Sequence, residues 1–186
     1  MAITAISFAS CNSGSNTAEN KKPSDTGHMA MMAMEATTTN STPSSLNEII
    51  AHYLQIKNAL AKDNSKEAAT GGTAMMESFA KFDQSKLTAE QKKAYEDIAG
   101  DAKEHAEHIG KSGDKIDHQR EHFASLSKDV YDLVKAIGGG QTLYQDYCPM
   151  YNNNKGATWI SETKEISNPY LGTKMPTCGS VKETIK

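Results

Sequence analysis

Four of the six histidines in this chain lie in one short stretch, and their spacing suits a metal ion. Separations of three and four residues place His105 with His108, and His118 with His122, on one face of a helix each. If the two helices form a hairpin through the turn at 110–114, His108 faces His118. One turn deeper, His105 faces His122. Because neutral imidazole binds Zn(II), Cu(II) and Ni(II) well, we predict a transition-metal site. The alternative is a core histidine at His105 and ordinary surface residues at His108 and His118.

The second cluster that could bind a metal is made of sulfur. Cys148 and Met150 flank one proline, and Met175 and Cys178 lie on either side of a second Pro-containing motif. Two thiols and two thioethers could build a trigonal or tetrahedral Cu(I) site. The alternative is a Cys148–Cys178 disulfide, worth about 3–4 kcal/mol for a loop of about 30 residues. If the two states alternate with redox conditions, the cysteines would gate metal release.

The N-terminal segment resembles the end of a bacterial export signal. Residues 1–11 are small and apolar up to Cys11, which follows Phe8-Ala9-Ser10 as the lipidated cysteine follows a lipobox. We therefore expect a protein of the periplasm or outer envelope, held at the membrane by a lipid anchor alone. The alternative is a cysteine that stands there by chance.

Residues 12–45 are rich in Ser, Thr, Asn and Pro and lack apolar periodicity, which predicts a disordered tether. A cluster of methionines next to one histidine interrupts this composition. Thioether sulfur is a soft ligand for Cu(I), so the cluster is a candidate accessory metal site. Chance, or a remnant of cloning, is the alternative. The candidate residues are His28, Met29, Met31, Met32 and Met34.

Apolar residues recur with helical spacing over four segments, 46–62, 65–82, 88–110 and 114–137. Short connections between them predict an all-α domain, an up-down-up-down four-helix bundle over residues 46–140. Gly71-Gly72 inside the second helix implies either an irregular helix or a very close neighbour. Residues 141–186 are predicted to form an irregular C-terminal cap of the same domain, with a short β-hairpin from 158–161 and 164–166.

Composition and motifs exclude several classes of function. The net charge is −3 with no basic stripe, so nucleic acid is not an expected partner. No run of about 20 apolar residues is present to span a bilayer. The chain lacks a phosphate-binding glycine loop, a nucleophile elbow, the Glu-x-x-His of di-iron bundles and the His-Glu-x-x-His of zinc proteases. We therefore expect no catalysis.

The histidine motifs and the C-terminal motifs resemble a bacterial envelope domain of unknown function. That domain occurs as small lipoproteins and fused to the periplasmic adaptors of copper and silver efflux pumps. The resemblance implies metal handling, and it carries no assigned activity. The resembling segments are 105–109, 118–123, 147–152, 155–159, 168–170 and 178–179. The positions that match the pattern are His105, His108, His118, His122, Cys148, Met150, Met175 and Cys178.

Together these features predict a lipid-anchored envelope protein that binds copper as a chaperone or buffer. Cu(I) is the favoured ion and would prefer the sulfur cluster, whereas Cu(II) or zinc would prefer the histidines. The alternative function is an interaction module that docks on an efflux-pump adaptor through a disulfide-stapled cap. A weaker alternative is a bundle that encloses an apolar or haem-like ligand.

Overall fold

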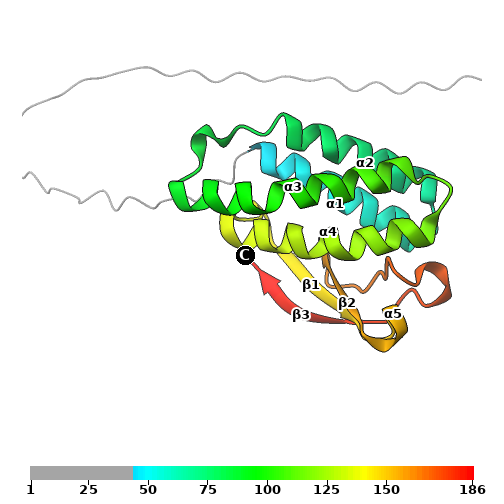
Figure 1. The fold of residues 1–186 in the computed structure, drawn as a ribbon. Helices are drawn as coiled ribbons and strands as arrows, with labels where there is room; N and C mark the ends of the chain where they lie inside the picture. Colours follow the sequence, from blue (N-terminus) through cyan, green and yellow to red (C-terminus); the bar gives the residue numbers. More distant parts are fainter. Residues whose placement is uncertain (1–43) are drawn as a thin grey trace, which may run out of the picture. The chain divides into compact units, whose positions relative to one another are not determined.

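The computed structural model describes residues 44–186, which are mostly helical and end in a small β-sheet (Figure 1). The four predicted helices are confirmed, with bounds within a few residues of those expected. A short 3-10 helix, η1 (Gln84–Lys86), connects the second helix to the third. The long helices are α1 (Ser44–Ala61), α2 (Ser65–Ala80), α3 (Ala89–Lys111) and α4 (Ile116–Ile137).

Helices adjacent in sequence also pack against each other: α1 on α2, α2 on α3, and α3 on α4. Their predicted apolar stripes form one buried core, in which Tyr53 of α1 stacks on Phe123 of α4 with ring centroids 5.1 Å apart. Burial of these stripes is the main force that holds a helical bundle together. Residues of this core include Ile49, Ile56, Leu60, Met75, Ile109, Leu126 and Val130.

Gly71 and Gly72 allow α2 to lie very close to both of its neighbours. A Cβ atom on Gly71 would meet the Ile56 side chain of α1 at 2.9 Å. One on Gly72 would meet the backbone of α3 at 2.7 Å, at the carbonyl oxygen of Ala106 and the amide of Gly110. Of the two explanations that the sequence left open, the close neighbour is therefore correct. This contact fixes the end of α3 that carries the histidines.

The C-terminal segment is a three-stranded antiparallel sheet, which corrects the prediction of an irregular cap. Its strands are β1 (Leu143–Cys148), β2 (Ala157–Ser161) and β3 (Ser180–Ile185), in the order β2-β1-β3. The predicted hairpin was wrong in one arm, because residues 164–166 form no strand and β2 pairs with β1 instead. The strand β3 is largely exposed and lacks the alternation of apolar residues that would have predicted it.

The connection between β1 and β2 is a tight turn labelled α5 (Tyr151–Asn154). Asn152, Asn153 and Asn154 all have φ between 54° and 63°, the left-handed region that asparagine tolerates better than most residues. Gly156 follows with φ of 77° and packs on the Tyr147 ring. A second short helix, η2 (Gly172–Lys174), lies in the segment that leads to β3.

The sheet packs on α4 and α1 through β2 (Figure 1). Trp159 and Ile160 are fully buried in this contact. The Tyr53 hydroxyl accepts a hydrogen bond from the Ile160 amide at 2.9 Å and lies 2.8 Å from the Ser127 hydroxyl. One buried tyrosine thus connects α1, α4 and β2, and the sheet shares the core of the helices.

Two sets of predicted residues lie outside the described part of the chain. They are the lipidation candidate Cys11 and the tether residues His28, Met29, Met31, Met32 and Met34. Within residues 44–186, none of the helices combines the length and the apolar character needed to cross a membrane.

Candidate metal centre

A buried glutamine holds the hairpin of α3 and α4 together on its core side. Gln119 is fully buried, and its Nε2 donates to the carbonyl oxygens of Ile109 at 3.1 Å and Ser65 at 2.9 Å. Both acceptors are main-chain carbonyl groups in terminal turns of helices: Ile109 lies in the last turn of α3 and Ser65 is the first residue of α2. Gln119 therefore ties the end of α3 and the start of α2 to the first turn of α4. Because Gln119 is anchored in this way, the backbone of the adjacent residue His118 is also held in place.

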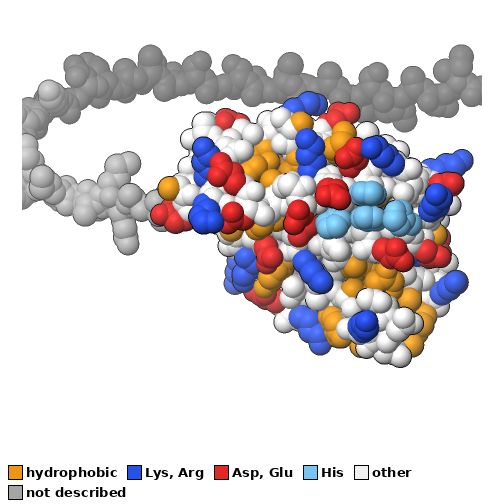
Figure 2. All heavy atoms as spheres, in the orientation of Figure 1, with side chains coloured by type: hydrophobic (Ala, Val, Ile, Leu, Met, Phe, Trp, Pro, Cys, Tyr) orange, Lys and Arg blue, Asp and Glu red, His pale blue; other side chains and the backbone are white. Residues whose placement is uncertain are grey.

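The four histidines form one cluster on the surface of this hairpin. Figure 2 shows their side chains gathered on one face of the molecule, with acidic groups close by. His122 is the centre of the cluster: its ring lies 4.3 Å from His108, 4.6 Å from His118 and 5.4 Å from His105, between centroids. The facing pairs are those expected from the sequence, and His108 and His118 are 6.2 Å apart.

Three of the four imidazoles lie close enough to share an ion. One nitrogen from each of His108, His118 and His122 falls within 4.8 Å of the other two. The fourth histidine, His105, lies deeper. Its Nδ1 is 3.1 Å from Nδ1 of His122, and its Nε2 is 4.0 Å from Oδ2 of Asp129 on α4. The structure thus brings all four predicted residues together but separates His105 from the set of three.

This geometry lies entirely within a segment that matches a known family. A sequence profile described as "Protein of unknown function (DUF3347)" matches residues 49–142, which is half of the chain. The chain belongs to this family. The match includes all four histidines and ends before β1, so Cys148 and Cys178 lie beyond it. No curated protein and no solved structure matches the chain significantly.

Because the family description assigns no activity, the chemistry of the cluster must come from its own environment. Burial lowers the pKa of His122 below its ordinary value of 6.5, and the neighbouring His108 and His118 lower it further. A lowered pKa favours neutral imidazole near neutral pH, which is the form that binds metals. The most central histidine is therefore favoured in its neutral, metal-binding form.

Carboxylates of Glu104 and Glu121 lie beside the cluster. An oxygen of Glu104 lies 3.8 Å from Nε2 of His108, and an oxygen of Glu121 lies 3.6 Å from Nδ1 of His118. Both carboxylates are well exposed, so these contacts contribute little to the stability of the fold. Asp129 was not predicted. It follows His122 by seven residues, so the heptad spacing along α4 could have revealed it.

The sulfur residues are only partly brought together. The Sγ atoms of Cys148 and Cys178 are 3.3 Å apart and both cysteines are free thiols. Cys148 is fully buried, whereas Cys178 is partly exposed, and its contact with Cys148 raises the pKa of the Cys178 thiol. Met150 and Met175 are 48% and 39% exposed, so neither side chain is enclosed with the thiol pair.

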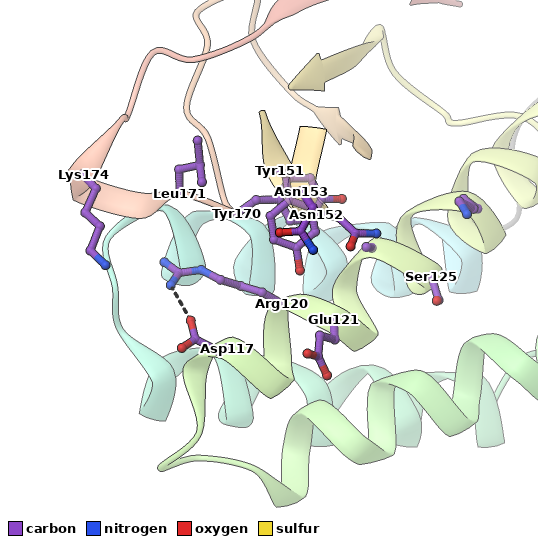
Figure 3. A pocket seen from close by; sticks show the side chains of 12 residues that line it. Asp117, Arg120, Glu121, Ser125, Tyr151, Asn152, Asn153, Tyr170, Leu171 and Lys174 are labelled. Carbon is purple, nitrogen blue, oxygen red and sulfur yellow. Dashed lines mark hydrogen bonds and ion pairs between the residues drawn. The ribbon is translucent and has the colours of Figure 1, made fainter. Parts of the chain in front are cut away.

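A surface pocket of about 630 Å³ lies on the next face of α4 (Figure 3). Its lining comes from α4, from the turn α5 and from the segment around η2, and it includes Tyr151, Asn152 and Lys174. Glu121 belongs both to this lining and to the surroundings of His118. A molecule in the pocket would therefore lie beside the histidine cluster.

Proposed function

We propose that this protein binds copper in the bacterial envelope and serves as a buffer or chaperone for the ion. The observation that carries the proposal is the convergence of His108, His118 and His122 from two helices, with ligand atoms within 4.8 Å of one another. Imidazole clusters of this kind suit first-row metals from nickel to zinc. The proposal includes an up-down-up-down arrangement of the four helices and a lipid anchor at Cys11. It includes no turnover.

The cluster must contract, and the stacked rings of His108 and His122 must turn, to close around an ion. Three nitrogens bound at about 2.0–2.1 Å would lie about 3.3–3.5 Å from one another. Since the side chains of His108 and His118 are nearly half exposed, they can rotate toward such a position without disturbing the core. Three protein ligands leave a coordination position open, and an open position lets an incoming ligand remove the ion. A buffer or chaperone requires this kind of exchange.

Copper is the favoured metal for two reasons. Copper(II) is bound most strongly of the divalent first-row ions by nitrogen ligands, and the resemblance to domains of copper and silver efflux systems points the same way. Cu(I) would additionally suit the thiol pair of Cys148 and Cys178. Zinc is the competing ion at the histidines.

The second candidate is a non-catalytic module that docks on an efflux-pump adaptor. It is favoured by the exposure of Met150 and Met175, which are among the most exposed large apolar side chains of residues 44–186. Methionine is common on surfaces that bind partners, because its side chain adapts to different shapes. A cap stapled by Cys148 and Cys178 would hold this surface in place.

The two candidates are separated by titrating the apo-protein with Cu(II), Zn(II) and, without oxygen, Cu(I), each against a competing chelator. The informative variant is His108→Ala with His118→Ala, and the matched control is His52→Ala on α1, whose ring contacts Gln55 instead of the cluster. The proposal is supported if the double variant loses Cu(II) binding and His52→Ala keeps it. Affinities weaker than micromolar for all ions in the wild type would refute it and favour the docking module.

A further inference from the structure

A chain of contacts leads inward from His122, the centre of the cluster. Nδ1 of His122 lies 3.1 Å from Nδ1 of His105, and Nε2 of His105 lies 4.0 Å from Oδ2 of Asp129. That carboxylate oxygen is buried and has no hydrogen-bond partner among residues 44–186. It lies in a largely enclosed position, since the Asp129 side chain is only 22% exposed. A buried oxygen without a partner favours the nearest N–H group.

The proton positions along this chain follow from simple hydrogen-bond rules. A neutral imidazole carries one N–H and one acceptor nitrogen. The Asp129 carboxylate favours the His105 proton on Nε2, which leaves Nδ1 of His105 as an acceptor. Nδ1 of His122 must then be the donor in the 3.1 Å contact, because one of the two nitrogens has to carry the hydrogen. The lone pair of His122 is consequently on Nε2.

We propose that Asp129 and His105 are positioning residues, and that His122 binds the metal through Nε2. The inference rests on the proposed metal binding and deepens it. A carboxylate behind a ligating histidine fixes its tautomer and orientation and makes it a better ligand. Here a second imidazole stands between the carboxylate and the ligand, so the effect of Asp129 passes through His105.

The same rules assign the other two donor atoms. The carboxylate of Glu104 faces Nε2 of His108 and favours the proton there, which leaves Nδ1 for the metal. The carboxylate of Glu121 faces Nδ1 of His118, which leaves Nε2. The resulting donor set is Nδ1 of His108 with Nε2 of His118 and His122. His105 is excluded from it, because its acceptor nitrogen is already engaged by His122.

The test is a long-range ¹H–¹⁵N NMR experiment on the full chain, recorded without metal and with Zn(II), which avoids the broadening caused by Cu(II). Without metal, His122 is expected as the Nδ1–H tautomer and His105 as the Nε2–H tautomer. With zinc, the Nε2 resonance of His122 shifts and His105 keeps its tautomer. Metal bound through Nδ1 of His122, or bound directly by His105, overturns the assignment.

Two substitutions measure the energetic part of the proposal. Asp129→Asn and His105→Gln are expected to weaken Zn(II) binding about 10- to 100-fold without abolishing it. Asp132→Asn is the control, since it removes an exposed acid from the same helix. Unchanged affinity in Asp129→Asn, with the fold verified by circular dichroism, would refute the positioning role. If the wild type binds no metal, the proposed function fails as well, whereas the tautomers of the metal-free protein still report on the hydrogen-bond chain.

Discussion

Arg120 of α4 donates a hydrogen bond from Nε to the main-chain carbonyl oxygen of Pro169, 2.9 Å away. The same guanidinium donates to the carbonyl oxygen of Leu60 at 3.1 Å and contacts the carboxylate of Asp63. The side chain is only 10% exposed. A single buried cation therefore joins α4 to the end of α1 and to the segment between β2 and β3.

We predict that Arg120→Ala destabilises the protein by about 3–5 kcal/mol, because it leaves the buried Pro169 carbonyl oxygen without this donor and removes the contacts with Leu60 and Asp63. The free energy of unfolding in urea measures the effect. Lys128→Ala, an exposed change on the same helix, should stay within about 0.5 kcal/mol of the wild type. Equal stability of both variants would show that Arg120 does not hold the cap.

Gly72→Ala should destabilise the protein more than a helix propensity scale would suggest. Alanine is favoured over glycine in a helix by about 1 kcal/mol, so an isolated helix would gain stability. In this fold the new Cβ would meet the α3 backbone at 2.7 Å, and backbone atoms cannot relieve the contact by a change of rotamer. We expect a net loss of about 1–3 kcal/mol. Gly100→Ala is the control, as nothing lies within 4 Å of its Cβ position, and it should be neutral or stabilising.

The buried carboxyl of Asp146 should make stability fall as the pH rises. Burial is the main cause that raises its pKa from 3.8 to about 7; Glu162 adds to the rise and Lys57 opposes it. Both oxygens lack hydrogen-bond partners within residues 44–186. Between about pH 4 and pH 7 the unfolded chain ionises while the folded protein keeps the proton. The folded state therefore loses stability over that window, on the order of 1 kcal/mol per pH unit, and no more above it.

Asp146→Asn removes this titration. The difference in unfolding free energy between the variant and the wild type should grow in favour of the variant from pH 4 to pH 7, and then remain constant. Measuring the same difference for Asp114→Asn, an exposed acid in the turn before α4, gives the background. A wild-type advantage that increases with pH would show that ionised Asp146 is stabilised in the fold.

Mild oxidation should join Cys148 and Cys178 within one molecule. A thiol oxidant such as diamide takes up two protons and two electrons from the pair, whose sulfurs are 3.3 Å apart. The closed loop should add about 3–4 kcal/mol of stability in the chain-entropy model. Non-reducing electrophoresis and intact mass of a Cys11→Ser background, with Cys148→Ser as the control, follow the reaction. Disulfide-linked dimers in place of the internal bond would contradict the expectation.

The helices could be predicted from the sequence because their apolar residues repeat with a period near 3.6. The apolar stripe of each helix packs against a neighbouring helix. The sheet could not be predicted in full. Asp146 occupies a buried position of β1 next to an irregularity in strand pairing, and β3 is an exposed edge strand. Neither strand therefore has the regular alternation of apolar and polar residues from which a half-buried strand is predicted.

The same holds for the site. The facing histidines followed from helical spacing and a symmetric turn, and the structure has these pairs. The roles of Asp129 and Arg120 did not follow, because a charged residue on a helix is normally exposed and only tertiary contacts show which ones are buried. The separation of His105 from the other three also depends on ring orientations, which spacing does not determine.

The most direct test of metal binding by the histidine cluster is electron paramagnetic resonance of the full chain loaded with one equivalent of Cu(II). Nitrogen couplings count the imidazoles bound to the ion, and we predict three, with fewer in His122→Ala and no change in His52→Ala. A spectrum of the wild type without histidine nitrogen couplings, or one that His122→Ala leaves unaltered, would contradict a copper site formed by His108, His118 and His122.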